Sequence, residues 1–405
     1  MTDAELEAAL TEAAKPDRDT TPGVTAMFAL AQRLDAERPE FAGVPPRMVQ
    51  SARGSHAFTG EFATQCMLSI VRDGRPPSEA VAWLKKAVTI ERGVGGAVKA
   101  LYGVTCDAPI ALADDIVLLP FAQLPQSVTR DWIVDEHNAA NSSAHRMVHS
   151  WTAPPAAALY RAGTFKPLFM GPVARSAADY TTTPPGLWFE ELDTAALLLA
   201  LTPNAVPSEA AHWFHHDDPD VALFAQRGIT RYGGDLSPSP FKSMQAPVTV
   251  TSDYAAGVLT SFRGLSAGDR DRVKLTLERL IRSRNHLHSG FRAIDLSTAL
   301  EVLFMNKDRD EHSYKIAMRL SKLLHTDPGE RQSAFLETRR LYDARSKMVH
   351  SGRISKDQWN VASGAKRNTY ELTEAGDLRT IAAIRKLMAR GKIPDDDGWA
   401  EIELG

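Results

Sequence analysis

The strongest constraint on the fold is a series of helical patterns in the last third of the chain, joined by short connections. Apolar residues recur at helical spacing after residue 251, and Ser266-Ala-Gly-Asp-Arg is typical of a helix start. We predict helices over about 268–285, 289–306, 311–325, 328–351 and 374–390, the fourth ending at Gly352. Because short connections between helices favour a bundle, residues 251–405 are predicted to form an all-α helical domain.

The preceding residues divide into two regions of different pattern. Residues 1–105 are predicted to be a helical N-terminal region, and the glycines after Arg92 are interpreted as a flexible turn. The predicted helices there span 3–14, 23–36, 61–72 and 78–91. Residues 106–250 contain short apolar runs separated by prolines, which indicates a β-containing region with a mostly antiparallel sheet. These runs are Ile110–Leu112, Ile116–Phe121, Leu187–Phe189 and Ala195–Leu201, and Leu236–Pro247 is predicted to be a linker. The predicted fold class is therefore α+β with several domains.

Cysteine content and hydropathy limit the classes of protein to consider. Cys66 and Cys106 are the only cysteines in 405 residues, too few for a disulfide framework or a cysteine-based zinc site. No apolar run reaches about 18 residues, and the acidic start lacks the features of a secretory signal. We therefore expect a cytoplasmic protein with no membrane partner.

Positive charge is concentrated in the C-terminal part of the chain. Residues 270–353 contain 18 Lys and Arg against 11 Asp and Glu, whereas the whole chain has a net charge of −3. A basic module on an acidic body suits a ligand that carries phosphate. Charge alone does not decide this, because a solvated helical surface rich in arginine has the same composition.

One segment near the end of the fourth predicted C-terminal helix combines an arginine and a histidine. Arg345 and His350 are five residues apart, in Leu341-Tyr-Asp-Ala-Arg-Ser-Lys-Met-Val-His-Ser-Gly352. Arginine binds a phosphate in a bidentate manner, and histidine transfers protons near neutral pH. The negative end of the helix dipole favours a protonated His350. Such spacing arises by chance about two or three times in a chain of this composition, and Arg282 and His288 also satisfy it. Spacing alone favours a surface arginine and a capping histidine.

The surrounding sequence resembles the HEPN superfamily (higher eukaryotes and prokaryotes nucleotide-binding domain), in particular its ApeA-like group. The similarity covers a quarter to a third of the chain. It lies in Ile294–Phe304, an apolar run with an embedded glutamate; in Tyr314–Leu324; in Leu341–Gly352, similar to the family's arginine–histidine element; and in the tail around Gly391–Asp395 and Trp399–Leu404. Through these segments together the C-terminal region resembles a HEPN helical bundle.

The resemblance implies a metal-independent endoribonuclease that acts as a homodimer and needs no cofactor. In this family the arginines and histidines of two protomers face one composite cleft. Arg345 would steady the scissile phosphate, and His350 would act as general acid and base while a ribose 2′-hydroxyl attacks. Ser346 occupies the polar position next to the arginine, and Lys347 is expected to add positive charge near the interface.

Two positions depart from the family's usual pattern, and one glutamate needs a partner. Ser351 replaces the usual glycine after the histidine, and Gly352 stands where some toxins carry a tyrosine that is AMPylated. Glu301 lies among apolar residues, where an unpaired carboxylate is costly, so we expect a cationic partner. The resemblance points to Arg345 as that partner, and an exposed glutamate on the helix flank is the alternative.

Two histidine-containing segments are weaker candidates for metal binding. His145 and His149 are four residues apart, as in some helical zinc sites, with Glu136 and His137 nearby. A second segment is rich in histidine and aspartate and could hold a divalent ion, although a solvated loop is the better interpretation. It comprises His212, His215, His216, Asp217, Asp218 and Asp220. We predict no metal site. The tryptophans Trp83, Trp132, Trp151, Trp188 and Trp213 are expected in the core.

The sequence therefore predicts an endoribonuclease, within bacterial anti-phage defence or abortive infection, in which the middle region senses a trigger. RNA is the expected substrate, and a phage-derived trigger is a further expected partner. Two alternatives stay open. One is a non-catalytic HEPN module that binds RNA or protein, and the other is the toxin of a toxin–antitoxin pair.

Overall fold

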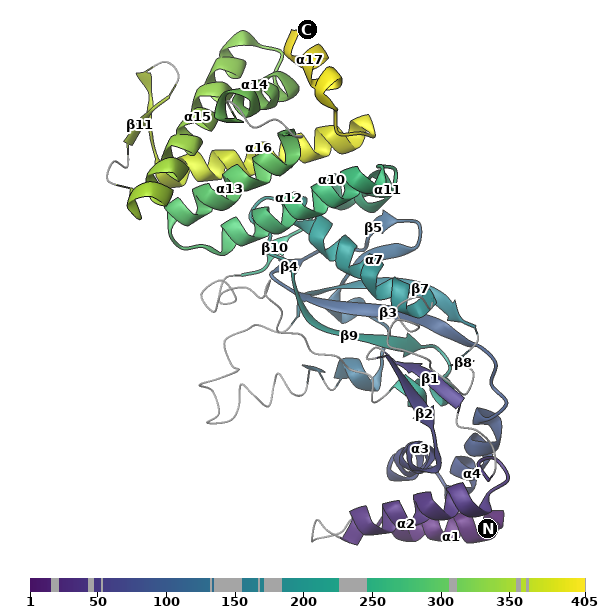
Figure 1. Ribbon diagram of the computed structural model, residues 1–405. Helices are drawn as coiled ribbons and strands as arrows, with labels where there is room; N and C mark the ends of the chain where they lie inside the picture. The colour runs from purple at the N-terminus through teal and green to yellow at the C-terminus, as the bar shows by residue number, and fades with distance from the viewer. Residues whose placement is uncertain are drawn as a thin grey trace.

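The computed structural model has an α+β architecture in three parts, with the N-terminal helices at one end, a sheet in the middle and the C-terminal helices at the other end (Figure 1). The structure describes residues 1–15, 22–42, 47–51, 54–131, 133–134, 155–166, 168–170, 184–225, 246–305, 312–354, 358–361 and 364–404. No helix in these ranges is both long and apolar enough to cross a membrane.

The N-terminal part contains the four predicted helices and also two strands that the sequence analysis did not predict. The helices are α1 (Asp3–Ala13), α2 (Pro22–Glu37), α3 (Gly60–Arg72) and α4 (Pro77–Ala87). Thr2 forms a capping box with Glu5, and Thr59 caps α3. The strands β1 (Arg47–Ser51) and β2 (Gly54–Phe58) form a small sheet with β8 (Phe169–Met170). Residues 1–105 are therefore not purely helical.

The middle part is built on a five-stranded antiparallel sheet, as predicted in outline. Its strand order is β5 (Ile110–Ala113), β6 (Ile116–Pro120), β7 (Ala157–Phe165), β3 (Gly93–Tyr102) and β9 (Ser208–His216). The interpretation of the glycines after Arg92 as a flexible turn was wrong, because they begin the central strand β3. A Cβ atom on Gly95 would lie 2.0 Å from the carbonyl oxygen of His215, so only glycine allows β9 this close.

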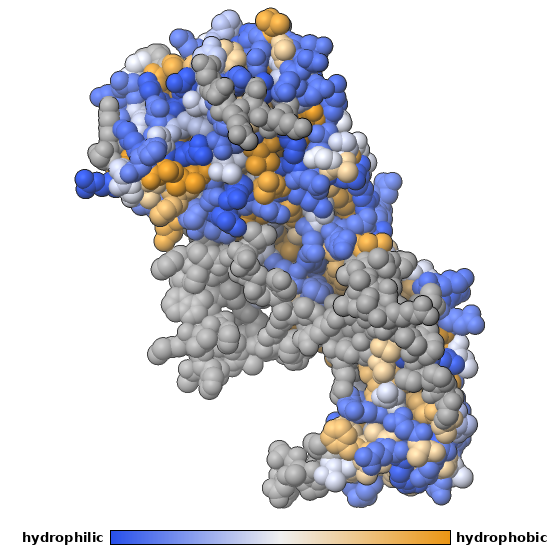
Figure 2. All heavy atoms as spheres, in the orientation of Figure 1, coloured by the Kyte–Doolittle hydropathy of each residue, from blue (hydrophilic) through white to orange (hydrophobic). Residues whose placement is uncertain are grey.

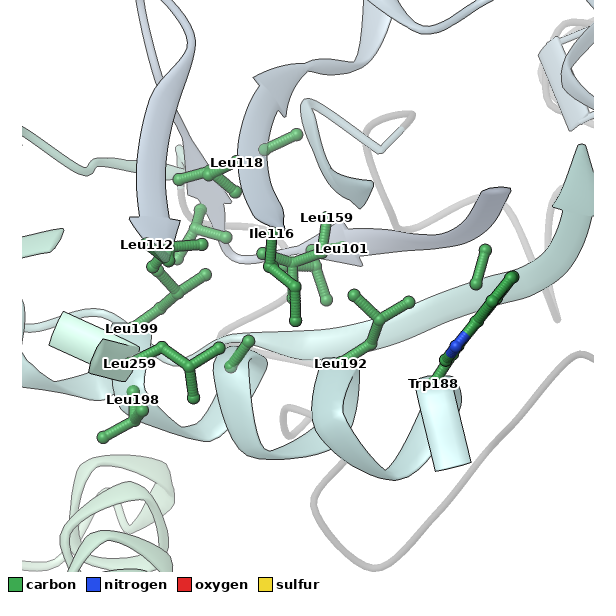
Figure 3. Close-up of a cluster of buried hydrophobic side chains, with 14 of the residues drawn as sticks. Leu101, Leu112, Ile116, Leu118, Leu159, Trp188, Leu192, Leu198, Leu199 and Leu259 are labelled. Carbon is green, nitrogen blue, oxygen red and sulfur yellow. The ribbon is translucent and has the colours of Figure 1, made fainter. Parts of the chain in front are cut away.

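One face of the sheet is covered by α7 (Pro184–Leu198), which continues into the short 3-10 helix η2 (Leu199–Leu201). The strands predicted over Leu187–Phe189 and Ala195–Leu201 are therefore wrong. A short apolar run fits a buried helix as well as a buried strand, and its periodicity does not distinguish the two. Figure 3 shows the resulting core, in which Leu192 from α7 lies near Leu101 and Leu159 from the sheet. Trp188, one helical turn earlier on α7, packs on Phe165 farther along β7. Trp83, Trp188 and Trp213 are buried as expected, whereas Trp132 and Trp151 lie outside the described residues.

Shorter elements complete the middle part and lead into the C-terminal helices. They are β4 (Val104–Thr105), η1 (Phe121–Gln123), α8 (Pro219–Ala225), β10 (Val248–Thr249), α10 (Ser252–Ala255) and α11 (Val258–Arg263). The parallel pairing of β10 with β4 brings the chain back to the sheet. The amide of Gly257 then donates to the carbonyl of Ala111, so residues 251–265 pack on the middle part. The predicted linker lies mostly outside the described residues.

The C-terminal part is a helical bundle, and its five predicted helices are confirmed. They are α12 (Ala267–Asn285), α13 (Ser289–Phe304), α14 (His312–Leu324), α15 (Pro328–Ser351) and α16 (Thr369–Arg390). Ser266 caps α12, and Gly352 ends α15 with a φ of 67°. A further helix, α17 (Asp396–Leu404), and the hairpin of β11 (Gln358–Asn360) and β12 (Lys366–Asn368) were not predicted.

One buried arginine joins the bundle to the middle part. Arg284, at the end of α12, is 1% exposed, and its Nε and Nη2 atoms each donate to Asp377 of α16 at 2.8 Å. Its Nη1 atom donates to the carbonyl oxygens of Ala200 and Ala205, at 2.8 and 2.6 Å, where α7 and η2 end. Asn204, in the same turn, is the one non-glycine residue of the described chain with a positive φ. A turn of the middle part is thus closed around a side chain of the bundle.

Candidate active site

The last turns of α15 carry Arg345 and His350. Leu341, Ala344 and Met348 are buried against the bundle, as their helical spacing predicted, and this fixes the direction of the remaining side chains. At 100° per residue, five positions along the helix separate the directions of Arg345 and His350 by about 140°. Within one chain, therefore, these two side chains leave the helix on different sides.

Arg345 forms an ion pair with Glu301, the glutamate for which the sequence predicts a cationic partner. Its Nη1 atom donates to Oε1 of Glu301, on α13, at 2.8 Å. The arginine side chain is 34% exposed and the glutamate 22%, so the pair remains open to solvent on one side. A partly exposed ion pair contributes at most about 1 kcal/mol to stability. Its main consequence is to orient the guanidinium while leaving other N–H groups free to bind a ligand.

Tyr342 lies next to the ion pair of Arg345 and Glu301 and contacts the arginine. Its hydroxyl donates to the carbonyl oxygen of Ser297 at 3.0 Å, which joins α15 to α13 one turn before the arginine. The guanidinium of Arg345 lies 5.8 Å from the centre of the Tyr342 ring. Burial raises the pKa of Tyr342 well above its usual value, so the phenol stays neutral. No role was predicted for Tyr342 from the sequence, although its place three residues before Arg345 puts both side chains on one side of the helix.

The side chains of His350 and Ser346 are exposed, whereas Lys347 is partly buried and contacts Trp359. No hydrogen bond or ion pair joins His350 to another residue that the structure describes, so its imidazole is accessible to a ligand. The ammonium of Lys347 lies 4.4 Å from the ring centre of Trp359, in the β11–β12 hairpin. Lys347 therefore helps to hold the hairpin on α15 as well as adding positive charge.

Ser351, which follows His350, lies at the end of the helix. Its hydroxyl oxygen lies 2.6 Å from the carbonyl oxygen of Lys347 and 2.8 Å from that of Arg353, and its single proton can be donated to either of them. Either bond gives a partner to a carbonyl oxygen at or just after the helix end. A serine at this position is therefore compatible with the helix end on which His350 sits.

The alternative pair of Arg282 and His288 has a different arrangement. His288 is the N-cap of α13, where its Nδ1 atom accepts the amide N–H of Gly290 at 3.0 Å. Arg282 is exposed on α12. His288 thus caps a helix, whereas His350 forms no hydrogen bond to another residue that the structure describes.

The histidine- and aspartate-rich segment does not gather into a metal site. It forms the end of β9 and the start of α8 rather than a solvated loop, and alternation along the strand places His215 on the opposite face from His216. His216 packs on Phe165, and burial lowers the pKa of His216 to about 4. Asp218 and Asp220 bind Lys86 instead.

Across the described ranges, no group of three or more His, Cys, Asp or Glu residues is arranged to hold a metal ion. Four residues of the other candidate segment lie outside those ranges, namely Glu136, His137, His145 and His149.

Comparison with protein-family models, curated proteins and solved structures finds no match to this chain.

Proposed function

We propose that the protein is a metal-independent endoribonuclease whose C-terminal helices form a HEPN bundle. The observation that carries this proposal is the end of α15, where Glu301 orients Arg345 and an exposed His350 follows at the helix terminus. A fixed guanidinium and an accessible imidazole are the two groups that cleavage of an RNA phosphodiester by its own 2′-hydroxyl requires.

In the proposed reaction the 2′-oxygen attacks the adjacent phosphorus and the bond to the 5′-oxygen breaks. His350 removes the proton of the 2′-hydroxyl while water protonates the leaving 5′-oxygen, or His350 protonates the leaving oxygen while water accepts the 2′-proton. Arg345 neutralises the charge on the phosphate oxygens. The products are a 2′,3′-cyclic phosphate and a 5′-hydroxyl. We place this activity in the cytoplasm, in anti-phage defence or abortive infection, with the middle part as the sensor of a trigger.

Activity in EDTA tests this function most directly. Purified protein incubated with total RNA is expected to cleave it at an unchanged rate in excess EDTA, because protein side chains supply both proton transfer and charge neutralisation. The new ends are expected to resist 3′-end ligation until the cyclic phosphate is opened and the resulting phosphate is removed. Activity that is lost in EDTA and restored by magnesium or manganese contradicts the proposal, and complete inactivity favours a non-catalytic binding module.

The active form is proposed to be a homodimer with α15 of each protomer at the interface. Because Arg345 and His350 leave one helix about 140° apart, a two-fold axis beside α15 lets the arginine of one protomer meet the histidine of the other. Two protomers also double the positive charge that faces the RNA.

Mixing two inactive variants tests the shared cleft. Arg345→Lys and His350→Ala proteins are each expected to be inactive alone and to regain cleavage when co-expressed, since a mixed dimer keeps one intact arginine–histidine pair across the interface. Light scattering should give twice the mass of one chain. A mixture that forms dimers but stays inactive, or a monomer that cleaves RNA, would refute the shared cleft.

A further inference from the structure

A cluster of rings lies on the surface where α13 begins. Phe291 is 46% exposed, although large apolar side chains are usually buried. The imidazoles of His286 and His288 flank it, each with its ring centre 5.6 Å from that of Phe291. Leu287, between the two histidines, is 72% exposed. We call Phe291, His286 and His288 the ring cluster.

The ring cluster is continuous with the end of α15. A Cβ atom on Gly290 would lie 2.7 Å from the sulfur of Met348, so the first turn of α13 touches the last turns of α15. Val349, the next residue after Met348, is 59% exposed. Figure 2 shows apolar atoms gathered among hydrophilic ones at this end of the bundle, where α13 begins and α15 ends in Figure 1.

The carboxylate nearest the ring cluster on α13 is buried and paired. One oxygen of Asp295 lies 3.3 Å from Nη1 of Arg279, and its second oxygen lies 2.8 Å from Nε2 of His286. Because Nδ1 of His288 accepts a backbone N–H, the proton of its neutral imidazole is on Nε2, which is a hydrogen-bond donor. The surface thus presents an aromatic face and a ring N–H donor on His288, next to an Asp295 carboxylate that is already paired.

We propose that the ring cluster binds an unpaired nucleobase of the RNA substrate, which stacks on Phe291. This inference rests on the proposed ribonuclease function and specifies its substrate as RNA that is single-stranded next to the cleaved phosphate. Aromatic side chains recognise single-stranded nucleic acid because every base has a π face, and duplex RNA keeps these faces covered. The base would lie beside α15, which carries the phosphate-binding Arg345.

Binding measurements on Phe291 variants test the platform. In a His350→Ala background, which prevents cleavage during the measurement, Phe291→Leu is expected to weaken binding of a short fluorescein-labelled single-stranded RNA by about tenfold. Phe291→Trp should bind as tightly as the parent or more tightly, since it keeps a ring. Competition with the same sequence as a duplex should be weak.

Phe28→Leu is the matched control, because Phe28 is also 46% exposed but lies on α2 in the N-terminal part. Equal RNA affinity of the Phe28→Leu and Phe291→Leu proteins would overturn the platform while leaving the nuclease intact. If the Phe291→Leu protein becomes monomeric but keeps its RNA affinity, the surface binds a second copy of the chain. That result would also overturn the proposal that the ring cluster binds a nucleobase. Failure of the parent to bind or cleave any RNA would overturn both the platform and the proposed function.

Discussion

Replacing His350 with alanine is expected to lower the rate of RNA cleavage by about 10²- to 10⁴-fold, the usual contribution of a general acid or base. The melting temperature should stay close to that of the parent, because His350 is exposed at the end of α15 and joins no other described residue by a hydrogen bond. The rate is measured with end-labelled RNA, and folding is checked by thermal denaturation followed by circular dichroism.

Two further variants make this result specific. Arg345→Lys should lose activity to a comparable extent, since an ammonium lacks the planar fork that binds phosphate oxygens. The Arg282→Ala variant, which changes an exposed arginine on α12, should keep the RNA cleavage activity of the parent. Full activity of the His350→Ala protein would contradict the assignment of His350 as the general acid or base. It would instead favour the alternative pair of Arg282 and His288.

The largest expected effect on stability comes from Arg284. Replacing it with methionine leaves the carboxylate of Asp377 buried without its partner and removes the donor to the carbonyls of Ala200 and Ala205. Loss of one partner of a buried ion pair costs about 3–5 kcal/mol of unfolding free energy. Urea denaturation followed by circular dichroism measures this change.

Arg282→Met is the control for that measurement, because Arg282 lies two residues earlier on the same helix and is exposed. Its unfolding free energy should stay within about 0.5 kcal/mol of the parent value. If the two methionine variants are equally stable, the buried arginine does not join the two parts of the chain.

The helices could be predicted because each carries its own signals. The spacing of Leu341, Ala344 and Met348 and the glycine at 352 define α15 without reference to any other segment. Strand β3 was missed because its glycines look like a turn, and only the close approach of β9 explains them. Helix α7 was mistaken for strands because its apolar run is buried against the sheet.

The candidate site divides in the same way. The ion pair between Glu301 and Arg345 could be predicted, because a carboxylate within an apolar run needs a cation. The ring cluster could not, since it depends on how the connection between α12 and α13 folds back. Besides Asp377, the acceptors of Arg284 are backbone carbonyls about 80 residues earlier in the chain, and such carbonyls carry no signal in the sequence.

The hydrogen bonds of Arg284 between the bundle and the middle part limit how the bundle can be transferred to another protein. A bundle transferred to another chain from Ser266 onward would carry Arg284 and Asp377 but leave behind the turn that contains Ala200 and Ala205. The guanidinium would then lose two backbone acceptors, and the face of α12 that packs on α7 and η2 would meet water. A working chimera therefore has to include the turn at 200–205 with the bundle, so the sheet and the bundle are expected to be exchanged between proteins as a pair.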